Sequence, residues 1–327
     1  MNRFEWVNAT SVAEAISLLD GKAVVKAGGV DLLDRMKEGL EAPPRLVNIR
    51  NVKGLDRISF DAKEGLRIGP LATLARVDEH PDVRRAYRAI ADAAGHTATP
   101  QIRNMATIGG NLVQRPRCWY FRQEDFHCRK KGGETCFAQE GENQYHAIMG
   151  NEICVIIFPS TPATALLAFD ARLEVTGPKG KREIALDEFF VSPEQDVRRE
   201  NSLAANELIT EVRVPAPAPG TRSAYTKQGE KESFDWPIAD VAVVLEMDGE
   251  TCRRASVVLG AAAPVPVRAK AAEAALVGKA ITEETARAAA KAAVSGATPL
   301  SENGYKVAVF EAVIRRTILD AAKGGTA

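Results

Sequence analysis

The chain has 327 residues, a length typical of about two domains, and its 45% hydrophobic and 26% charged residues are ordinary for a globular protein. Its 43 basic and 43 acidic side chains cancel, so nothing global favours nucleic acid or an anionic membrane. No apolar run approaches the ~20 residues of a membrane span, and the N-terminus lacks the apolar segment of a signal peptide. We expect a cytoplasmic protein by default, with co-export to the periplasm with a partner as the alternative.

The first 40 residues predict a strand and a helix, followed by a strand, a glycine turn and a second helix. Residues 4–7 form the first strand, and Ser11 with Glu14 makes the capping-box pattern of a helix start. The second strand covers residues 23–27 and ends in paired glycines, and a helix follows at 31–37. Short strands and turns are expected at 45–79, and a helix from 81 to 94.

A second glycine turn follows at residues 106–111, and neither turn matches the G-x-G-x-x-G or P-loop patterns. Glycine allows backbone N–H groups to approach a phosphate closely. The first turn also opens a helix, whose N-terminus favours an anion. Two such turns suit a pyrophosphate clasped from both sides, and the alternative is a pair of ordinary tight turns.

Four of the five cysteines fall in or beside an irregular stretch at 114–153, which is polar, basic and aromatic. Their spacing, C-x9-C-x7-C-x17-C, lacks the close pairs of structural zinc sites and the ferredoxin pattern. Without a secretion signal, such a cluster predicts a metal or iron–sulfur site rather than disulfides. Unligated thiols in a solvated basic loop are the alternative. Basic neighbours would stabilise a negative thiolate cluster: Arg115, Arg117, Arg122, Arg129, Lys130 and Lys131.

The last third of the chain begins after a proline-rich connector at 215–220, which we take as a domain boundary. Residues 241–247 and 255–259 predict a hairpin with an Asp-Gly turn. Alanine-rich helices are expected at 268–277, 282–294 and 303–321. Strands and helices alternate without a regular βαβ repeat, which indicates the α+β class. Cys252 lies near the hairpin and is expected to be an inert structural thiol.

The two glycine turns in their sequence context carry a resemblance to a known family. Residues 27–33 and 102–111 resemble the two flavin signatures of the medium, FAD-binding subunit of the xanthine oxidase family of molybdenum hydroxylases. Segments 68–73, 208–212 and 225–227 extend the resemblance over essentially the whole chain. It implies a two-lobed FAD-binding domain at 1–220, with an inserted loop at about 114–154, and a smaller α+β domain at 221–327.

The resemblance also implies which residues contact FAD. From the first turn these are Lys26, Ala27, Gly28, Gly29, Val30, Asp31 and Leu32, and from the second Thr107, Gly110 and Asn111. Leu208 corresponds to an apolar residue near the isoalloxazine ring, and Lys227 to a lysine near the flavin. One departure is Thr161, which follows Ser160 where the family usually has an aspartate that helps to hold the nucleotide.

Residues 111–122 and 146–150 resemble the insertion of a subgroup that includes 4-hydroxybenzoyl-CoA reductase and the periplasmic aldehyde oxidoreductases. That insertion holds a [4Fe-4S] cluster through four cysteines. The implied ligands are Cys118, Cys128, Cys136 and Cys154, and the spacing to Cys154 is the least closely matched.

The implied function is electron transfer. Substrate chemistry belongs to a molybdenum-cofactor large subunit, a small subunit carries [2Fe-2S] clusters, and FAD on this chain passes electrons to an external acceptor. No residue of this chain is expected to be catalytic. The rivals are a stand-alone flavoenzyme, which needs a base near the flavin, and a zinc-containing assembly module without enzymatic activity.

Overall fold

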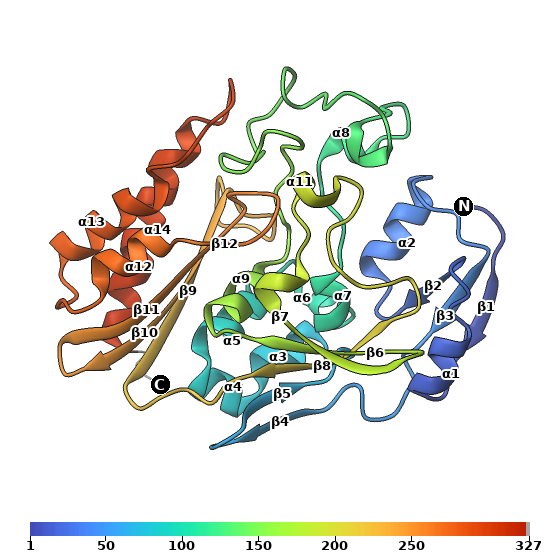
Figure 1. Ribbon diagram of the computed structural model, residues 1–327, viewed down its shortest axis with the longest axis horizontal. Helices are drawn as coiled ribbons and strands as arrows, with labels where there is room; N and C mark the ends of the chain where they lie inside the picture. Colours follow the sequence, from blue (N-terminus) through green and yellow to red (C-terminus); the bar gives the residue numbers. More distant parts are fainter. Residues whose placement is uncertain (325–327) are drawn as a thin grey trace.

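The computed structural model describes residues 1–324, and its strands form three sheets (Figure 1). The N-terminal lobe is a small parallel sheet in the order β1 (Glu5–Asn8), β3 (Arg45–Asn48) and β2 (Ala23–Lys26). Helices α1 (Val12–Ser17) and α2 (Val30–Lys37) connect these strands. The predicted capping box of α1 forms only in part. Ser11 Oγ accepts from Glu14 N at 3.1 Å, whereas the Glu14 carboxylate accepts from Thr10.

The second lobe contains a five-stranded sheet and the helices that cover it. In sheet order the strands are β4 (Ile58–Asp61), β5 (Gly65–Ile68), β8 (Leu208–Val214), β6 (Arg172–Gly177) and β7 (Gly180–Ala185). The helices are α3 (Leu74–Glu79), α4 (Pro81–Ala86), α5 (Arg88–Gly95), α6 (Pro100–Arg103), α7 (Ile108–Leu112), α9 (Thr161–Ala168), α10 (Leu186–Phe189) and α11 (Pro193–Asp196).

The prediction of a single helix at 81–94 is wrong. The chain leaves helical geometry at Tyr87 (φ −136°, ψ 49°), which separates α4 from α5. Tyr87 is fully buried between the rings of Phe60 and Phe169, and its hydroxyl donates to the Pro215 carbonyl at 3.0 Å. These tertiary contacts outweigh the local helical pattern.

The C-terminal part is a four-stranded antiparallel sheet against three helices. Its strands are β12 (Val267–Arg268), β11 (Thr251–Gly260), β10 (Ala239–Asp248) and β9 (Thr221–Gln228), and its helices are α12 (Lys270–Leu276), α13 (Glu283–Val294) and α14 (Tyr305–Lys323). The predicted hairpin with its Asp248-Gly249 turn is confirmed. Val241 and Val243 pack with the three helices, while Ala242 and Val244 join the core of the second lobe. The sheet is therefore buried on both faces. The three sheets and their helices together confirm the predicted α+β class.

The insertion at 114–153 crosses the top of the molecule in Figure 1, from the side of α2 towards the C-terminal helices. Its regular structure is one helical turn, α8 (Trp119–Arg122), and one 3₁₀ turn, η1 (Arg129–Lys131). Aromatic rings pack inside it: the ring centre of Phe126 lies 5.0 Å from that of Tyr120 and 5.2 Å from that of Phe137. The insertion is thus irregular, as predicted, yet it has a small aromatic core.

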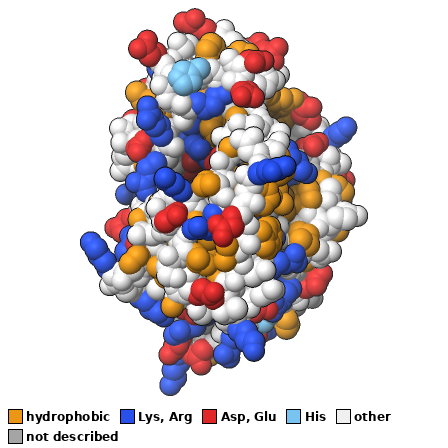
Figure 2. Space-filling model, turned by 90° about the vertical axis from the view of Figure 1, so that its right-hand side faces the viewer, with side chains coloured by type: hydrophobic (Ala, Val, Ile, Leu, Met, Phe, Trp, Pro, Cys, Tyr) orange, Lys and Arg blue, Asp and Glu red, His pale blue; other side chains and the backbone are white. Residues whose placement is uncertain are grey.

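Acidic and basic side chains are interspersed over the face shown in Figure 2, and hydrophobic side chains gather near its middle. Across residues 1–324, none of the helices combines the length and apolar character needed to span a membrane.

Candidate functional site

A cavity of about 640 Å³ opens between the N-terminal lobe, the second glycine turn and the loop before β10. This volume lies in the usual range of ligand and cofactor sites. Both glycine turns line it, although they are far apart in the sequence. Of the residues implied as FAD contacts, the cavity brings together Ala27, Gly28, Gly29, Val30, Asp31, Leu32, Thr107, Gly110, Asn111, Leu208 and Lys227.

The first turn places the start of α2 against this cavity. Gly29 adopts the left-handed conformation (φ +83°) just before Val30, the first residue of α2, so a side chain here would be strained. A Cβ on Gly28 would collide with the Met105 carbonyl oxygen, which shows how closely the two turns approach each other. The N-terminal N–H groups of α2 therefore face a narrow space that suits an anionic group.

The second turn begins α7, and its polar side chains fix the neighbouring helix. Thr107 Oγ1 accepts from Gly110 N at 3.2 Å and caps α7. Asn111 is hydrogen-bonded to Ser160, whose Oγ also accepts from Ala163 N at 3.1 Å and caps α9. This arrangement brings Thr161, at the start of α9, into the cavity wall. A neutral hydroxyl therefore stands where the family pattern has a carboxylate.

The two lysines implied as FAD contacts occupy different places. Lys227 lines the cavity from β9 and donates to the His96 carbonyl at 3.1 Å, and burial lowers the pKa of its ammonium group. Lys26 is not among the lining residues. Its ammonium lies 5.3 Å from the ring centre of Trp6, and burial likewise lowers its pKa. The Lys26 ammonium therefore lies against Trp6, outside the lining of the cavity.

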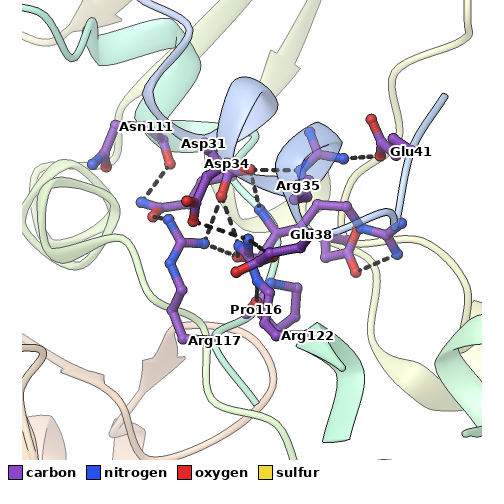
Figure 3. Close-up of polar contacts among 12 residues, drawn as sticks. Asp31, Asp34, Arg35, Glu38, Glu41, Asn111, Pro116, Arg117 and Arg122 are labelled. Carbon is purple, nitrogen blue, oxygen red and sulfur yellow. Dashed lines mark hydrogen bonds and ion pairs between the residues drawn. The ribbon is translucent and has the colours of Figure 1, made fainter. Parts of the chain in front are cut away.

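Asp31 lines the cavity, but its carboxylate also holds the insertion in place (Figure 3). Oδ1 pairs with Arg117 at 2.7 Å and Arg122 at 2.8 Å, and Oδ2 accepts from Arg35 Nε at 3.0 Å and from Arg115 N at 3.1 Å. Burial acts to raise the Asp31 pKa, but the surrounding guanidinium groups outweigh it and the pKa is lowered. Asp31 therefore stays ionised and joins the first glycine turn to the insertion.

Sequence reasoning missed two parts of the cavity wall. One is the loop from His96 to Thr99, in which Ala98 adopts a left-handed backbone conformation (φ 48°). The other is the segment from Phe234 to Pro237, where Phe234 and Trp236 are largely exposed. Two large apolar residues in an otherwise polar loop were the available signal for the second segment.

The four clustered cysteines converge in space, because Cys118, Cys128, Cys136 and Cys154 all line one small hollow under the insertion. Within residues 1–324, however, no three His, Cys, Asp or Glu side chains form a group that could hold a metal ion. The predicted cluster ligands are therefore neighbours without a preformed single-ion site.

The thiols of this hollow are surrounded by hydrogen-bond donors. Backbone N–H groups of Phe121 and Tyr120 point to Cys118, although burial dominates and raises the pKa of that thiol to about 12. The Cys154 thiol donates to Cys136, which lowers the pKa of Cys136 to about 6 and raises that of Cys154.

His146 Nε2 lies 3.2 Å from Cys118 Sγ, and burial lowers the pKa of this imidazole to about 4. This contact links the second part of the insertion to the first of the four clustered cysteines.

Four of the six basic residues beside the cysteines form ion pairs with Asp31 or Glu200, which the sequence did not predict. Arg117 and Arg122 pair with Asp31, and Arg115 and the buried Lys130 both pair with Glu200, at 3.0 and 2.8 Å. These ion pairs anchor the insertion to the FAD-binding lobes. The positive charge of Lys130 also acts to lower the pKa of the Cys154 thiol.

Cys252 lies apart from this group, buried in β11, and its thiol donates to the Arg254 carbonyl at 3.3 Å. This position agrees with the expected structural thiol.

Comparison with known proteins places these features in a family. The model of the FAD binding domain in molybdopterin dehydrogenase matches residues 2–217, and that of the CO dehydrogenase flavoprotein C-terminal domain matches residues 224–321. The chain is 34% identical to the aldehyde oxidoreductase FAD-binding subunit PaoB of Escherichia coli, over 97% of both chains. It is 29% identical to the carbon monoxide dehydrogenase medium chain of Hydrogenophaga pseudoflava, over 97% of this chain and 96% of that one.

The fold agrees with these sequence matches. A chain in the solved structure of carbon monoxide dehydrogenase from Hydrogenophaga pseudoflava superposes with a TM-score of 0.76 and 31% identity over 98% of both chains. A chain of quinoline 2-oxidoreductase from Pseudomonas putida 86 gives the same TM-score at 26% identity. The cavity between two glycine turns is thus found in a chain whose first 217 residues match an FAD binding domain almost throughout. This chain belongs to the family of FAD-binding medium subunits of the molybdenum hydroxylases.

Proposed function

We propose that this chain carries electrons from partner subunits to an external acceptor, through FAD bound in the cavity between the glycine turns. The observation that carries the proposal is the convergence of two remote glycine turns on one cavity of about 640 Å³. The start of α2 and the backbone of the second turn would hold the pyrophosphate. Leu208 and Lys227 would border the flavin ring, which supplies the redox chemistry.

The proposal includes two partner subunits, a large one with the molybdenum cofactor and a small one with [2Fe-2S] clusters, in a heterotrimer or a multimer of it. Its support is that the relatives are medium chains or FAD subunits of enzymes that oxidise aldehydes or carbon monoxide. The chemistry on the organic substrate would then take place outside this chain.

We further propose that the insertion holds a [4Fe-4S] cluster through Cys118, Cys128, Cys136 and Cys154. The support is that these four thiols line one hollow and that backbone N–H groups point at the sulfur atoms of Cys118, Cys136 and Cys154. Such hydrogen bonds stabilise thiolate sulfur and tune the cluster potential. Formation of the cluster would require the Cys136 and Cys154 thiols, which are hydrogen-bonded to each other, to move apart.

Chemical analysis of the protein purified without oxygen tests both parts. The proposal predicts FAD together with iron and acid-labile sulfide, and a broad brown absorbance beneath the flavin bands. FAD without iron would contradict the cluster and leave the flavin relay. Zinc without flavin or sulfide would contradict the whole proposal and favour an assembly module.

A further inference from the structure

A buried carboxyl group lies behind the wall of the FAD cavity and has no part in the function proposed so far. Asp240 is the second residue of β10 and is 1% exposed. By strand alternation it shares a face with Ala242 and Val244, which point into the apolar core of the second lobe. An ionisable group at such a position is costly unless it is paired or has a function.

The neighbours of Asp240 leave room for the carboxyl group instead of neutralising it. Gly260 is its partner on β11, and a Cβ there would collide with the Asp240 carboxyl and the Thr164 hydroxyl. Lys227, its partner on β9, sends its ammonium to the His96 carbonyl instead. The charges of Lys227 and Lys306 act on Asp240, but both ammonium groups donate to backbone carbonyls instead of pairing with its carboxyl group.

Hydroxyl groups connect Asp240 to the cavity. The Tyr225 hydroxyl donates to Asp240 Oδ2 at 3.3 Å. Thr161 bonds to the same Tyr225 oxygen and lies 2.7 Å from Thr97 Oγ1. Thr161 and Thr97 both line the FAD cavity, whereas Tyr225 and Asp240 lie behind it. Hydroxyl groups therefore lie in series from the cavity wall to the buried carboxyl, and the Thr161 and Thr97 hydroxyls also donate to the Ala93 carbonyl at 3.1 and 2.8 Å.

We propose that Thr161, Tyr225 and Asp240 form a relay that passes one proton between the FAD cavity and the protein interior. The inference rests on FAD occupying that cavity. Two-electron reduction of a flavin consumes at least one proton, and the iron–sulfur centres of the partner subunits supply electrons only.

The step balances as a series of proton transfers. The bond from Tyr225 to Asp240 is the arrangement after the transfer, with Asp240 as carboxylate. Before it, the protonated Asp240 donates to Tyr225, and the O–H bond of Asp240 breaks as a new O–H bond forms on Tyr225. The former Tyr225 proton passes to the Thr161 oxygen, and the former Thr161 proton leaves into the cavity. Asp240 is left as a carboxylate, and reoxidation of the flavin reverses each transfer.

The charges around Asp240 agree with such a role. Burial raises its pKa to about 7, against the lowering effects of Thr164 on α9, Tyr225 and Lys227 on β9, and Lys306 on α14. A donor with a pKa near the working pH is the most effective in proton transfer. Burial also raises the pKa of Tyr225 well above its usual value, so Tyr225 conducts a proton without remaining ionised.

The test is infrared difference spectroscopy of the assembled, flavin-loaded complex during anaerobic reduction, recorded together with the visible flavin bands. We expect the carboxylic acid C=O band of Asp240 to disappear as the flavin bleaches, and this change to be absent in Asp240→Asn. Flavin bleaching tests the proposed function, and the carboxyl band tests the relay, so the two failures are distinguishable.

Rates provide a second measurement that does not depend on Asp240→Asn folding. Tyr225→Phe and Thr161→Val should slow flavin reduction by roughly 10²-fold or more and increase its solvent isotope effect. Tyr87→Phe is the matched control, because its buried hydroxyl bonds to the Pro215 carbonyl outside the chain of hydroxyls. A carboxyl band unchanged in Asp240→Asn, or wild-type rates in both relay variants with normal flavin content, would overturn the proposal.

Discussion

Single glycines decide whether the two turns can enclose a pyrophosphate. The glycines differ in how much space surrounds them, and so in whether a side chain would disturb the fold or the cofactor. Gly28 touches the backbone of the second turn, so a side chain there would push the two lobes apart. Gly110 has more room, since a Cβ would meet only Thr107 Oγ1, at 3.1 Å. Substitution of Gly28 should therefore harm the fold itself, and substitution of Gly110 mainly the binding of the cofactor.

Gly110→Val is predicted to give a folded but flavin-poor protein. A branched side chain would occupy the space where backbone N–H groups approach the pyrophosphate. A ligand present at 100 times its Kd adds roughly 2.7 kcal/mol of stability, so the variant should melt earlier than the flavin-loaded wild type. Flavin absorbance and thermal melting measure both effects, with Gly296→Ala as a control in open space. Full flavin occupancy in Gly110→Val would be incompatible with the assignment.

Asp31→Asn is predicted to destabilise the protein by roughly 3–5 kcal/mol, because it leaves buried arginines without their shared carboxylate. Asp34→Asn on the same helix should change stability by less than ~0.5 kcal/mol, since Asp34 is largely exposed and lies 3.5 Å from Arg122. Chemical unfolding of the two variants measures the contrast. Equal losses in both would show that Asp31 is not the anchor.

The ion pairs of Asp31 also predict that the stability of the protein depends on pH. The Asp31 pKa is lowered in the folded protein, so its stabilisation is present above the unfolded value of ~3.9 and is lost as the pH falls through the folded pKa. The melting temperatures of wild type and Asp31→Asn should therefore converge in acid. A constant difference down to low pH would contradict this sign.

The residues also show what sequence alone could and could not predict. The two glycine turns that line the cavity and the grouping of four cysteines were visible in the sequence, because paired glycines and cysteine spacing are local signals. The ion pairs by which Asp31 anchors the insertion could not be predicted, since Arg117 and Arg122 are more than 80 residues away in the chain. Asp240 was equally hidden, because nothing near it in the sequence reveals the Tyr225 hydroxyl that faces it.

At the scale of elements, the insertion has more internal packing than its sequence indicated. The spacing of polar and aromatic residues shows no periodicity, yet Tyr120, Phe126 and Phe137 pack against one another. Its second half is fixed to the C-terminal domain, where Asn143 and Glu302 exchange hydrogen bonds at 2.9 and 3.0 Å. A cluster would therefore complete a partly ordered segment rather than order a featureless loop.

Cys136→Ser is predicted to abolish the iron–sulfur cluster while FAD remains bound at the separate glycine turns. Serine is a poor ligand for a [4Fe-4S] centre, whose iron atoms are normally held by four thiolates. Iron and acid-labile sulfide content, with low-temperature electron paramagnetic resonance after reduction, measures the loss. Cys252→Ser is the matched control, because Cys252 lies buried in β11 away from the hollow. Unchanged iron in Cys136→Ser would remove that residue from the ligand set.

At the scale of the whole molecule, the insertion links the parts that an electron relay must hold together. Arg122 binds Asp31 beside the FAD cavity, and Lys306 of the C-terminal helix α14 donates to the His146 carbonyl at 2.9 Å. The proposed cluster would therefore lie between the cofactor lobe and the C-terminal domain. This arrangement is consistent with transfer through the chain rather than with a substrate site on it.

The isolated chain is predicted to bind FAD and to oxidise no substrate by itself, because the substrate chemistry is assigned to the molybdenum subunit. The assay compares the chain alone with the chain plus its molybdenum and [2Fe-2S] subunits, using aromatic and aliphatic aldehydes and a dye acceptor. Robust dye reduction by this chain alone would favour the stand-alone flavoenzyme.

Anaerobic flavin bleaching is the most direct measurement of the electron-relay role. A substrate that the complete complex oxidises is mixed without oxygen, first with the flavin-loaded chain alone and then with the complex, while the flavin absorbance is recorded. We expect the flavin to stay oxidised in the isolated chain and to bleach in the complex. Bleaching in the isolated chain, or substrate oxidation by the complex with the flavin left oxidised, would contradict it.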